Sequence, residues 1–353
     1  MLATLAGVRE AGFQPLVAAP PSGPLADALR SAGVEIVAFD VRDPSGTRAP
    51  LERLRNNLAD LIQRCRPDLV HANSLAMGRL SGPVTAALRG PSVAHLRDIV
   101  GLSARAIADL NCHGRLLAVS QAVRDFHVAA GLDGERVHVL YNGVDLRRFC
   151  PRAASGYLHR ELGLPPRVPL VGTIGQISLR KGQDLLLEAF RPVAQRSDAR
   201  LLIIGQRLSV KEESRHHEAE LMRLAGEALA DRVFFLGVRE DVDRLLSELT
   251  LLVHPARQEP LGRVLLEAAA AGTPVIATDV GGTREIFPPE CQAARLVPPN
   301  DVPALTAAME ELLADAETQG RLAAAARRRA EECFDRETAT AGLVQQYRRL
   351  LDA

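Results

Sequence analysis

The sequence predicts an α/β protein with two doubly wound, Rossmann-like domains that face a cleft. Three observations predict this fold class. Short apolar strands alternate with helices along the chain, which is typical of parallel sheets covered on both faces. The 353 residues exceed the size of one typical core. A segment rich in proline, glycine and charge, residues 150–170, interrupts the alternation, which then starts again.

The first half of the chain begins with a helix, predicted over residues 1–12 and ending at Gly12. A strand at 13–20, a helix at 23–33 and a strand at 34–39 follow. Further strands are predicted at 67–74, 91–98, 114–120 and 136–143, each ending in polar residues. Ligands gather beyond the carboxyl ends of parallel strands, where these polar residues would lie. We assign residues 1–150 to an N-terminal domain.

The second half repeats the pattern. Strands are predicted at residues 168–176, 199–205, 232–237, 249–256 and 273–280, with helices between them. We assign residues 166–335 to a C-terminal domain and residues 151–165 to a linker. The last segment, residues 336–353, has the spacing of one more amphipathic helix.

The order of the first elements is unusual. A doubly wound half normally starts with a strand and a phosphate-facing turn, whereas this chain starts with a helix. We therefore expect that a strand and a glycine-rich loop are missing ahead of residue 1, through truncation or a mis-assigned start.

Composition argues against several classes of protein. The formal net charge is zero and aromatic residues make up 3%, so nucleic acid is not an expected partner. Five scattered cysteines without a CxxC pair favour neither disulfides nor zinc, and they suit a reducing compartment. No apolar run has the length of a membrane span, and the first residues lack signal-peptide features. The cytoplasm is the expected location.

The segment EPLGRVLLEAAAAGTPVIATDVGGTREI, residues 259–286, places two carboxylates around the start of a helix. Pro260 and Gly262 predict that the helix begins at 261–263, so Glu259 precedes it and Glu267 lies in its second turn. The first N–H groups of such a helix, at Leu261, Gly262, Arg263 and Val264, suit a phosphate. Together these groups are suited to hold a sugar nucleotide.

A simpler alternative remains open for both glutamates. Glu259 would then only complement the helix dipole, and Glu267 would pair with Arg263 at i,i+4.

A second candidate site follows the strand that ends at Gly175. The loop after it carries Arg180 and Lys181 ahead of another helix, and cations there would neutralise a diphosphate leaving group. The alternative is a solvated basic loop.

The strand at 91–98 places His95 and Arg97 at its end, facing the expected cleft. The alternative is that His95 is a polar residue with its hydrogen bonds satisfied inside the domain. Another histidine candidate, SRHHEAE at 214–220, could bring His216 and Glu220 onto one face, but its adjacent charges predict a solvated helix.

Taken together, these segments resemble retaining glycosyltransferases of family 4, which have the GT-B fold. Residues 259–286 closely resemble the Glu-x7-Glu signature of that family, and GQISLRKGQDLLLEAF resembles its diphosphate loop. PDLVHANS, LLAVSQAV and VLYNGVDLRRF resemble its first-domain landmarks, in the expected order. The resemblance covers essentially the whole chain.

The resemblance implies a role for each matching residue. Glu259 would contact the donor sugar, Glu267 the ribose, and Lys181 with Arg180 the diphosphate. His95 would reach the sugar or diphosphate from the first domain. We expect Glu259 and Lys181 to occupy exposed cleft positions.

The resemblance further implies that the segment around Val238 and Arg239 lines the base pocket, and that helix 336–353 packs back on the first domain. Many family members carry Arg where this chain has Gln176, which removes one charge near the diphosphate. Arg180 could compensate for that loss. Neither a cofactor nor a metal is expected, and we expect no Asp-x-Asp metal motif.

The implied activity is a retaining transfer of sugar from a UDP- or GDP-sugar to an acceptor hydroxyl. The acceptor is left open among lipids, polysaccharides and small metabolites, as are oligomeric state and peripheral contact with a membrane. One alternative is a truncated or inactive protein of this fold that binds a sugar nucleotide without transfer. A third, an epimerase or phosphorylase on the same scaffold, is the weakest hypothesis.

Overall fold

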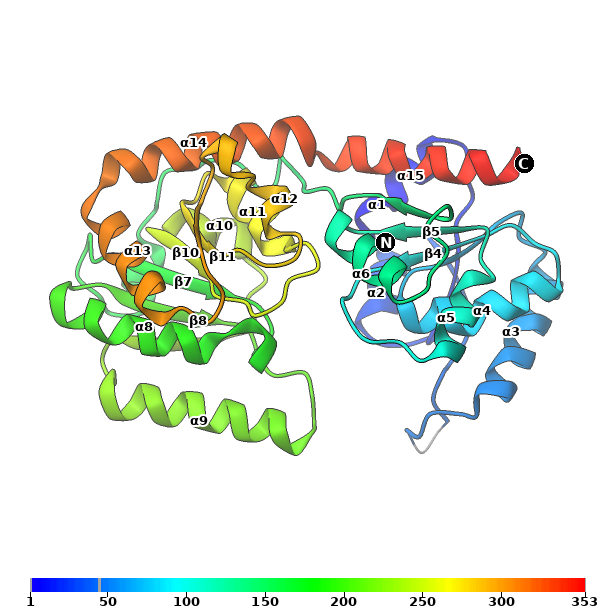
Figure 1. The fold of residues 1–353 in the computed structure, drawn as a ribbon, viewed down its shortest axis with the longest axis horizontal. Helices are drawn as coiled ribbons and strands as arrows, with labels where there is room; N and C mark the ends of the chain where they lie inside the picture. Colours follow the sequence, from blue (N-terminus) through cyan, green and yellow to red (C-terminus); the bar gives the residue numbers. More distant parts are fainter. Residues whose placement is uncertain (1, 44–45, 353) are drawn as a thin grey trace. The chain divides into compact units, whose positions relative to one another are not determined.

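The computed structural model describes residues 2–43 and 46–352 (Figure 1). The chain forms two compact units. Unit 1 contains residues 1–143 and 336–353, and unit 2 contains residues 144–335. Each unit is an α/β structure with parallel strands.

Unit 1 contains two parallel sheets, one of β1-β2 and one of β3-β4-β5-β6. Both sheets are parallel, as the alternation of strands and helices predicts. The elements in chain order are α1 (Leu2–Glu10), β1 (Leu16–Ala19), α2 (Pro24–Ser31), β2 (Glu35–Ala38), α3 (Leu51–Cys65), β3 (Val70–Ala72), α4 (Leu75–Ala87), β4 (Ser92–Leu96), α5 (Ala104–Asn111), β5 (Arg115–Ala118), α6 (Gln121–Ala129), β6 (Val137–Val139) and α15 (Arg336–Leu351).

Serines at the strand-to-helix junctions of unit 1 begin the helices. The hydroxyl of Ser74 accepts a hydrogen bond from the Met77 amide at 3.3 Å at the start of α4. Ser120 caps α6 in the same way through Val123, at 3.0 Å. A serine cap satisfies one of the orphan amides of a helix start, so each strand ends in a defined turn at the carboxyl edge of the sheet.

The C-terminal helix α15 belongs to unit 1 and packs on α1 (Figure 1). Leu343, Val344 and Tyr347 of α15 share a buried cluster with Val93 of β4 and Leu117 of β5. Apolar burial thus ties the last helix of the chain to the four-stranded sheet.

Unit 2 is built on one six-stranded parallel sheet in the order β12-β11-β10-β7-β8-β9. The elements in chain order are α7 (Tyr157–Glu161), β7 (Leu170–Ile174), the 3₁₀ helix η1 (Leu179–Lys181), α8 (Gln183–Arg196), β8 (Arg200–Ile204), α9 (Glu212–Ala228), β9 (Val233–Gly237), α10 (Val242–Glu248), β10 (Leu251–His254), α11 (Arg263–Ala271), β11 (Val275–Thr278), α12 (Thr283–Ile286), the 3₁₀ helix η2 (Pro289–Cys291), β12 (Arg295–Val297), α13 (Val302–Ala314) and α14 (Ala316–Cys333).

The strand order of unit 2 reverses at β7. The chain proceeds from β7 to β8 and β9 on one side, then returns to β10, which pairs with β7 on the other side. Such a reversal is a topological switch point, where the loops after adjacent strands separate and leave room for a ligand.

The segment 151–165, predicted as a linker, is part of unit 2. The carboxylate of Glu248, which is 6% exposed, accepts hydrogen bonds from the Ser155 amide, the Ser155 hydroxyl and the Gly156 amide at 2.6, 2.7 and 2.9 Å. A buried carboxylate needs such donors, so this contact fixes the segment against α10. Its proline and glycine content gave no sign of this anchoring.

No helix among residues 2–43 and 46–352 combines the length and the hydropathy that crossing a membrane requires.

Candidate functional site

The two loops that carry Lys181 and Glu259 meet at the switch point of unit 2. One follows β7 and the other follows β10, the strand beside it. Gly182 permits the close approach, because a Cβ there would lie 2.0 Å from the carbonyl oxygen of Pro255 and its φ is +68°. A residue with a side chain would both clash and be strained at this position.

Glu259 joins Lys181 and His254 in a buried cluster. The Lys181 Nζ lies 2.5 Å from Oε2 of Glu259, and the His254 Nε2 lies 2.7 Å from the same oxygen. Glu259 is 5% exposed, and the Lys181 side chain is 14% exposed. The prediction that both residues occupy exposed positions is therefore wrong: the switch point brings β10, β7 and their loops together around the carboxylate.

The electrostatics of the cluster keep Glu259 ionised. Burial by itself raises the pKa of this carboxyl, but the contacts with His254, followed by the charge and hydrogen bond of Lys181, outweigh burial and hold the pKa at about 2. Burial lowers the pKa of His254, so its ring is neutral and donates Nε2–H to the carboxylate. Lys181 therefore supplies the positive charge that stabilises Glu259.

The Gly-Gly turn after β11 supports the Glu259 loop. The Gly282 amide donates to the Glu259 carbonyl oxygen at 3.0 Å. A Cβ on Gly282 would lie 2.5 Å from the Pro260 carbonyl oxygen, so only glycine allows this contact. The turn thus positions the backbone that carries the carboxylate.

Helix α11 begins at Arg263, inside the predicted range. No side chain caps it, and the cap residue Gly262 has a φ of +105°. Leu261 is 2% exposed and anchors the loop, and the Leu265 amide donates to the Gly262 carbonyl at 3.0 Å. Arg263 and Val264 are thus the first two residues of an uncapped helix that starts four residues after Glu259.

Glu267 pairs with Arg263 at i,i+4, as the simpler alternative for this carboxylate predicts. Its Oε1 lies 3.3 Å from Nε of Arg263, whose side chain is 83% exposed. The Glu267 side chain is 17% exposed, and burial raises its pKa. An i,i+4 pair with an exposed arginine is worth little, so this contact leaves the carboxylate able to accept a ligand hydroxyl.

Arg257 binds residues on both sides of Lys181 and holds the loop in place. Arg257 makes a bidentate ion pair with Asp184 at 2.8 and 2.6 Å and donates to the Leu179 carbonyl oxygen at 2.7 Å. Arg180 donates from Nη1 to the carbonyl oxygen of Gln258 at 3.2 Å. These contacts join the two loops on both sides of Lys181.

Gln176, predicted in the donor site, lies at the start of the same loop. Its carbonyl oxygen accepts a hydrogen bond from the Gln183 side chain at 3.0 Å. This bond ties the start of the loop to the first residue of α8.

Val238 and Arg239, predicted at the base pocket, follow β9. Val238 is 61% exposed, whereas the Arg239 guanidinium binds both Glu161 and Asp241. The hydrogen bonds that Arg239 donates to Asp241 and Glu161 raise the pKa of its guanidinium. Two carboxylates therefore already pair with the guanidinium.

His95 lies inside unit 1 rather than with the carboxylate cluster of unit 2. It is 4% exposed on β4, and its Nδ1 bonds His71 Nε2 at 2.7 Å. His71 Nδ1 in turn bonds the Tyr347 hydroxyl of α15 at 2.5 Å. Burial lowers the pKa of His95 well below its ordinary value and that of His71 to about 3, so both rings are neutral. His95 therefore has the environment of the alternative interpretation, in which it is a polar residue hydrogen-bonded inside the domain.

His254 and the Asp184–Arg257 pair are the contacts that sequence reasoning missed. His254 ends an apolar strand five residues before Glu259, and a polar residue at that place was the available signal. Asp184 and Arg257 are far apart in sequence, and only the pairing of β7 with β10 brings their loops together.

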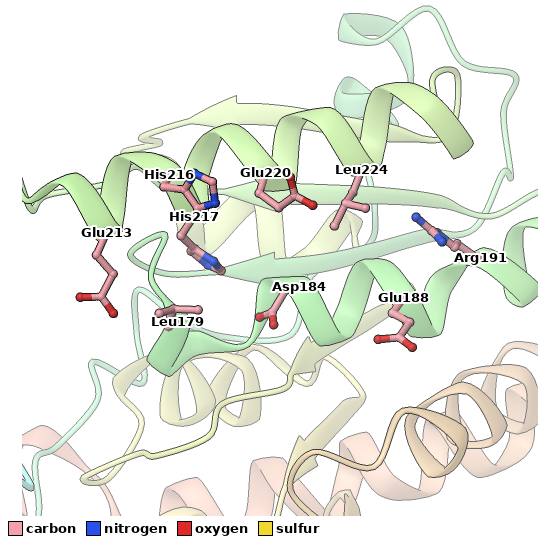
Figure 2. A pocket seen from close by; sticks show the side chains of 9 residues that line it. All are labelled: Leu179, Asp184, Glu188, Arg191, Glu213, His216, His217, Glu220 and Leu224. Atoms are coloured by element: carbon pink, nitrogen blue, oxygen red, sulfur yellow. The ribbon is translucent and has the colours of Figure 1, made fainter.

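A hollow of about 500 Å³ lies between α8 and α9, next to the Lys181 loop (Figure 2). Leu179 and Asp184 line one side, and His216 and Glu220 line the other. The predicted solvated helix does expose His216, but the neighbouring His217 is 7% exposed and its Nε2 has no hydrogen-bond partner.

Within the described residues, no group of three or more His, Cys, Asp or Glu side chains could hold a metal ion. The chain does contain an Asp-x-Asp sequence at 241–243, so the expectation that it has none is wrong. Both carboxylates bind arginines: Asp241 pairs with Arg239, and Asp243 pairs with Arg148 and Arg152.

The fold and this site define a class. It is a doubly wound α/β protein whose lysine, carboxylate and uncapped helix start lie at the switch point, where proteins of this class hold their ligands.

Comparison with known proteins narrows the class to a family. Residues 157–329 match the family "Glycosyl transferases group 1", and residues 1–148 match "Glycosyltransferase Family 4". The 2-deoxystreptamine N-acetyl-D-glucosaminyltransferase of Streptomyces fradiae is 32% identical over 79% of this chain and 75% of its own length. The chain belongs to this family of glycosyltransferases.

Other relatives agree over shorter stretches. A D-inositol 3-phosphate glycosyltransferase of Salinispora tropica is 35% identical over 56% of this chain, but the match spans only 43% of that relative. The crystal structure of Anabaena Alr3699/HepE in complex with UDP and glucose has a TM-score of 0.85 and 24% identity. It covers 98% of this chain and 95% of its own, which shows the shared GT-B fold.

Proposed function

We propose that this protein is a retaining, metal-independent glycosyltransferase that moves a sugar from a nucleotide-diphosphate sugar to an acceptor hydroxyl. The observation that carries the proposal is the Lys181–Glu259–His254 cluster at the switch point of unit 2, beside the uncapped start of α11. The UDP bound to the structural neighbour supports UDP as the first nucleotide to test.

In this proposal Lys181 binds the diphosphate. An ammonium group has three N–H donors, and the hydrogen bond to Glu259 uses one of them. Two donors remain for phosphate oxygens, with the first amides of α11 as further donors. Stabilising the negative charge that develops on the departing diphosphate lowers the barrier to transfer.

Glu259 orients the donor sugar in the same proposal. Its Oε2 accepts from both Lys181 and His254, whereas Oε1 has no partner among the described residues. The free oxygen of an ionised carboxylate accepts a hydrogen bond from a sugar hydroxyl. Glu267 accepts the ribose hydroxyls, and Arg180 adds charge near the diphosphate.

The test is release of nucleoside diphosphate from a panel of UDP- and GDP-sugars, with the anomeric configuration of the product read by NMR. Retention, and turnover that is unchanged by a metal chelator, are the expected results. An inverted product or loss of turnover with chelator would refute those two parts of the proposal. Tight binding of sugar nucleotides without transfer to any acceptor would favour the binding-protein alternative.

A further inference from the structure

Arg97 directly follows β4, and its half-buried guanidinium is held by neutral groups. Its Nε donates to the Asn73 carbonyl oxygen at 3.1 Å and its Nη2 to Asn73 Oδ1 at 2.8 Å. Its Nη1 donates to Asn142 Oδ1 at 3.1 Å. Asn73 and Asn142 therefore fix the orientation of the planar guanidinium group.

Arg97 makes no ion pair among the described residues, although the charge of the adjacent Asp98 acts on it and raises its pKa against the lowering by burial. The Asp98 side chain is exposed, so water screens this interaction. Arg55 in the same unit shows the usual arrangement, with Asp109 at 2.8 Å. A partly buried charge without an opposite charge is costly, so such a group is typically kept for a ligand.

Arg97 and the two asparagines leave N–H groups available to donate hydrogen bonds to a ligand. Three of its five N–H bonds are used, which leaves one on Nη1 and one on Nη2. A guanidinium only donates, so both carboxamide oxygens must face it, and each Asn Nδ2 is left as a further donor. His71 and His95 behind it have lowered pKa values and add no charge.

These donors lie where a ligand is expected. Asn73 follows β3, Arg97 follows β4 and Asn142 lies three residues after β6, so all three are at the carboxyl edge of one parallel sheet. A planar fork at such an edge matches the paired oxygens of a phosphate or carboxylate.

We propose that Arg97, Asn73 and Asn142 form an oxyanion-recognition site in unit 1 that binds a phosphate or carboxylate group of a substrate. This inference deepens the proposed function. It rests on that function for identifying the bound anion as part of a substrate. The anion belongs either to the acceptor or to the donor diphosphate, and the two sources give different results below.

The first experiment measures thermal unfolding against inorganic phosphate at constant ionic strength, with chloride as the control salt. It uses the full chain carrying Lys181→Met and Glu259→Gln, which removes the lysine of the other phosphate site. We expect phosphate to raise the Tm of this background. Adding Asn73→Asp supplies an internal counterion 2.8 Å from Nη2 while leaving Arg97 in place, so the apparent phosphate affinity should fall at least tenfold.

The matched control is Arg115→Gln. Arg115 begins β5, at the opposite edge of the same sheet, and also donates to a neutral amide, Gln346 Oε1, at 2.8 Å. Its substitution should leave the phosphate response unchanged. A response that survives Asn73→Asp, or no response in the background, would overturn the site. Should the aspartate variant not fold, Arg97→Gln must lose the response, and its retention would be equally decisive against the proposal.

The second experiment decides the source of the anion. UDP is titrated into the wild type and into Asn73→Asp by calorimetry. An unchanged affinity assigns the anion to the acceptor, and a tenfold loss assigns it to the donor; both results support the site. Phosphate binding needs no turnover, so a phosphate response without any sugar transfer would refute the proposed function and leave this site standing.

Discussion

Replacing Lys181 by methionine removes the cation that faces the buried carboxylate of Glu259. Methionine keeps most of the length of the side chain, so the change is chiefly one of charge. The carboxylate is 5% exposed and retains only the hydrogen bond from the neutral His254. Because a buried charge without a partner is strongly unfavourable, the native state should be destabilised.

The size of the effect follows from the pKa of Glu259. Its pKa is about 2 in the folded protein, against an ordinary value of 4.5. At about 1.4 kcal/mol for each pKa unit, this difference corresponds to ~3 kcal/mol of stability. The contacts with His254 make the larger part of this difference, and the charge and hydrogen bond of Lys181 make the smaller part. Lys181→Met should therefore lower the free energy of unfolding by about 1–2 kcal/mol.

The assay is urea unfolding at pH 7 of the wild type, Lys181→Met, Glu259→Gln and the double variant. The double variant removes both charges and should recover most of the loss, which gives a coupling free energy of about 1 kcal/mol. All three variants should lose transfer. Additive single effects would refute the argument that the two charges depend on each other.

The pH dependence provides an independent check. The folded-state pKa of Glu259 lies below the ordinary value, so its stabilisation is fully present above pH 4.5 and is lost as pH falls toward about 2. The stability difference between the wild type and Glu259→Gln should shrink over that range. A difference that stays constant between pH 5 and pH 2.5 would contradict the assigned pKa.

Three further predictions concern neighbouring contacts. Gly182→Ala should lower the free energy of unfolding by more than ~2 kcal/mol, because its Cβ would lie 2.0 Å from the Pro255 carbonyl oxygen. The control is Gly163→Ala, where φ is a similar +62° but the space around the Cβ is open. In urea unfolding, this control should lower the free energy of unfolding by only about 1 kcal/mol. Glu267→Gln should weaken UDP binding measured by calorimetry while Tm changes little, since the one ion pair of Glu267 within residues 2–43 and 46–352 is with the exposed Arg263. An unchanged affinity would argue against the ribose role. Arg239→Gln should lower Tm, because Glu161 and Asp241 lose their common partner, and a reduced UDP affinity with an unchanged Tm would instead support a direct role in binding.

Much of this site is predictable from the sequence because its geometry is local. The spacing of Glu259, Pro260, Gly262 and Glu267 defines a loop, a helix start at 263 and a carboxylate in the second turn. The alternation of strands and helices likewise indicates parallel sheets, since short apolar strands with covered faces have few other solutions. Chain-local rules therefore determined the fold class and the candidate residues.

The tertiary structure decided what each residue touches. Lys181 and Glu259 are 78 positions apart, and they meet because β10 returns to pair with β7 at the reversal of strand order. That meeting buries both side chains, brings in His254 and holds Glu259 ionised. In unit 1, the packing of β4 takes His95 into the interior and leaves Arg97 at the sheet edge without an ion-pair partner among the described residues. Burial and charge pairing depend on long-range strand order, which the local pattern of residues does not encode.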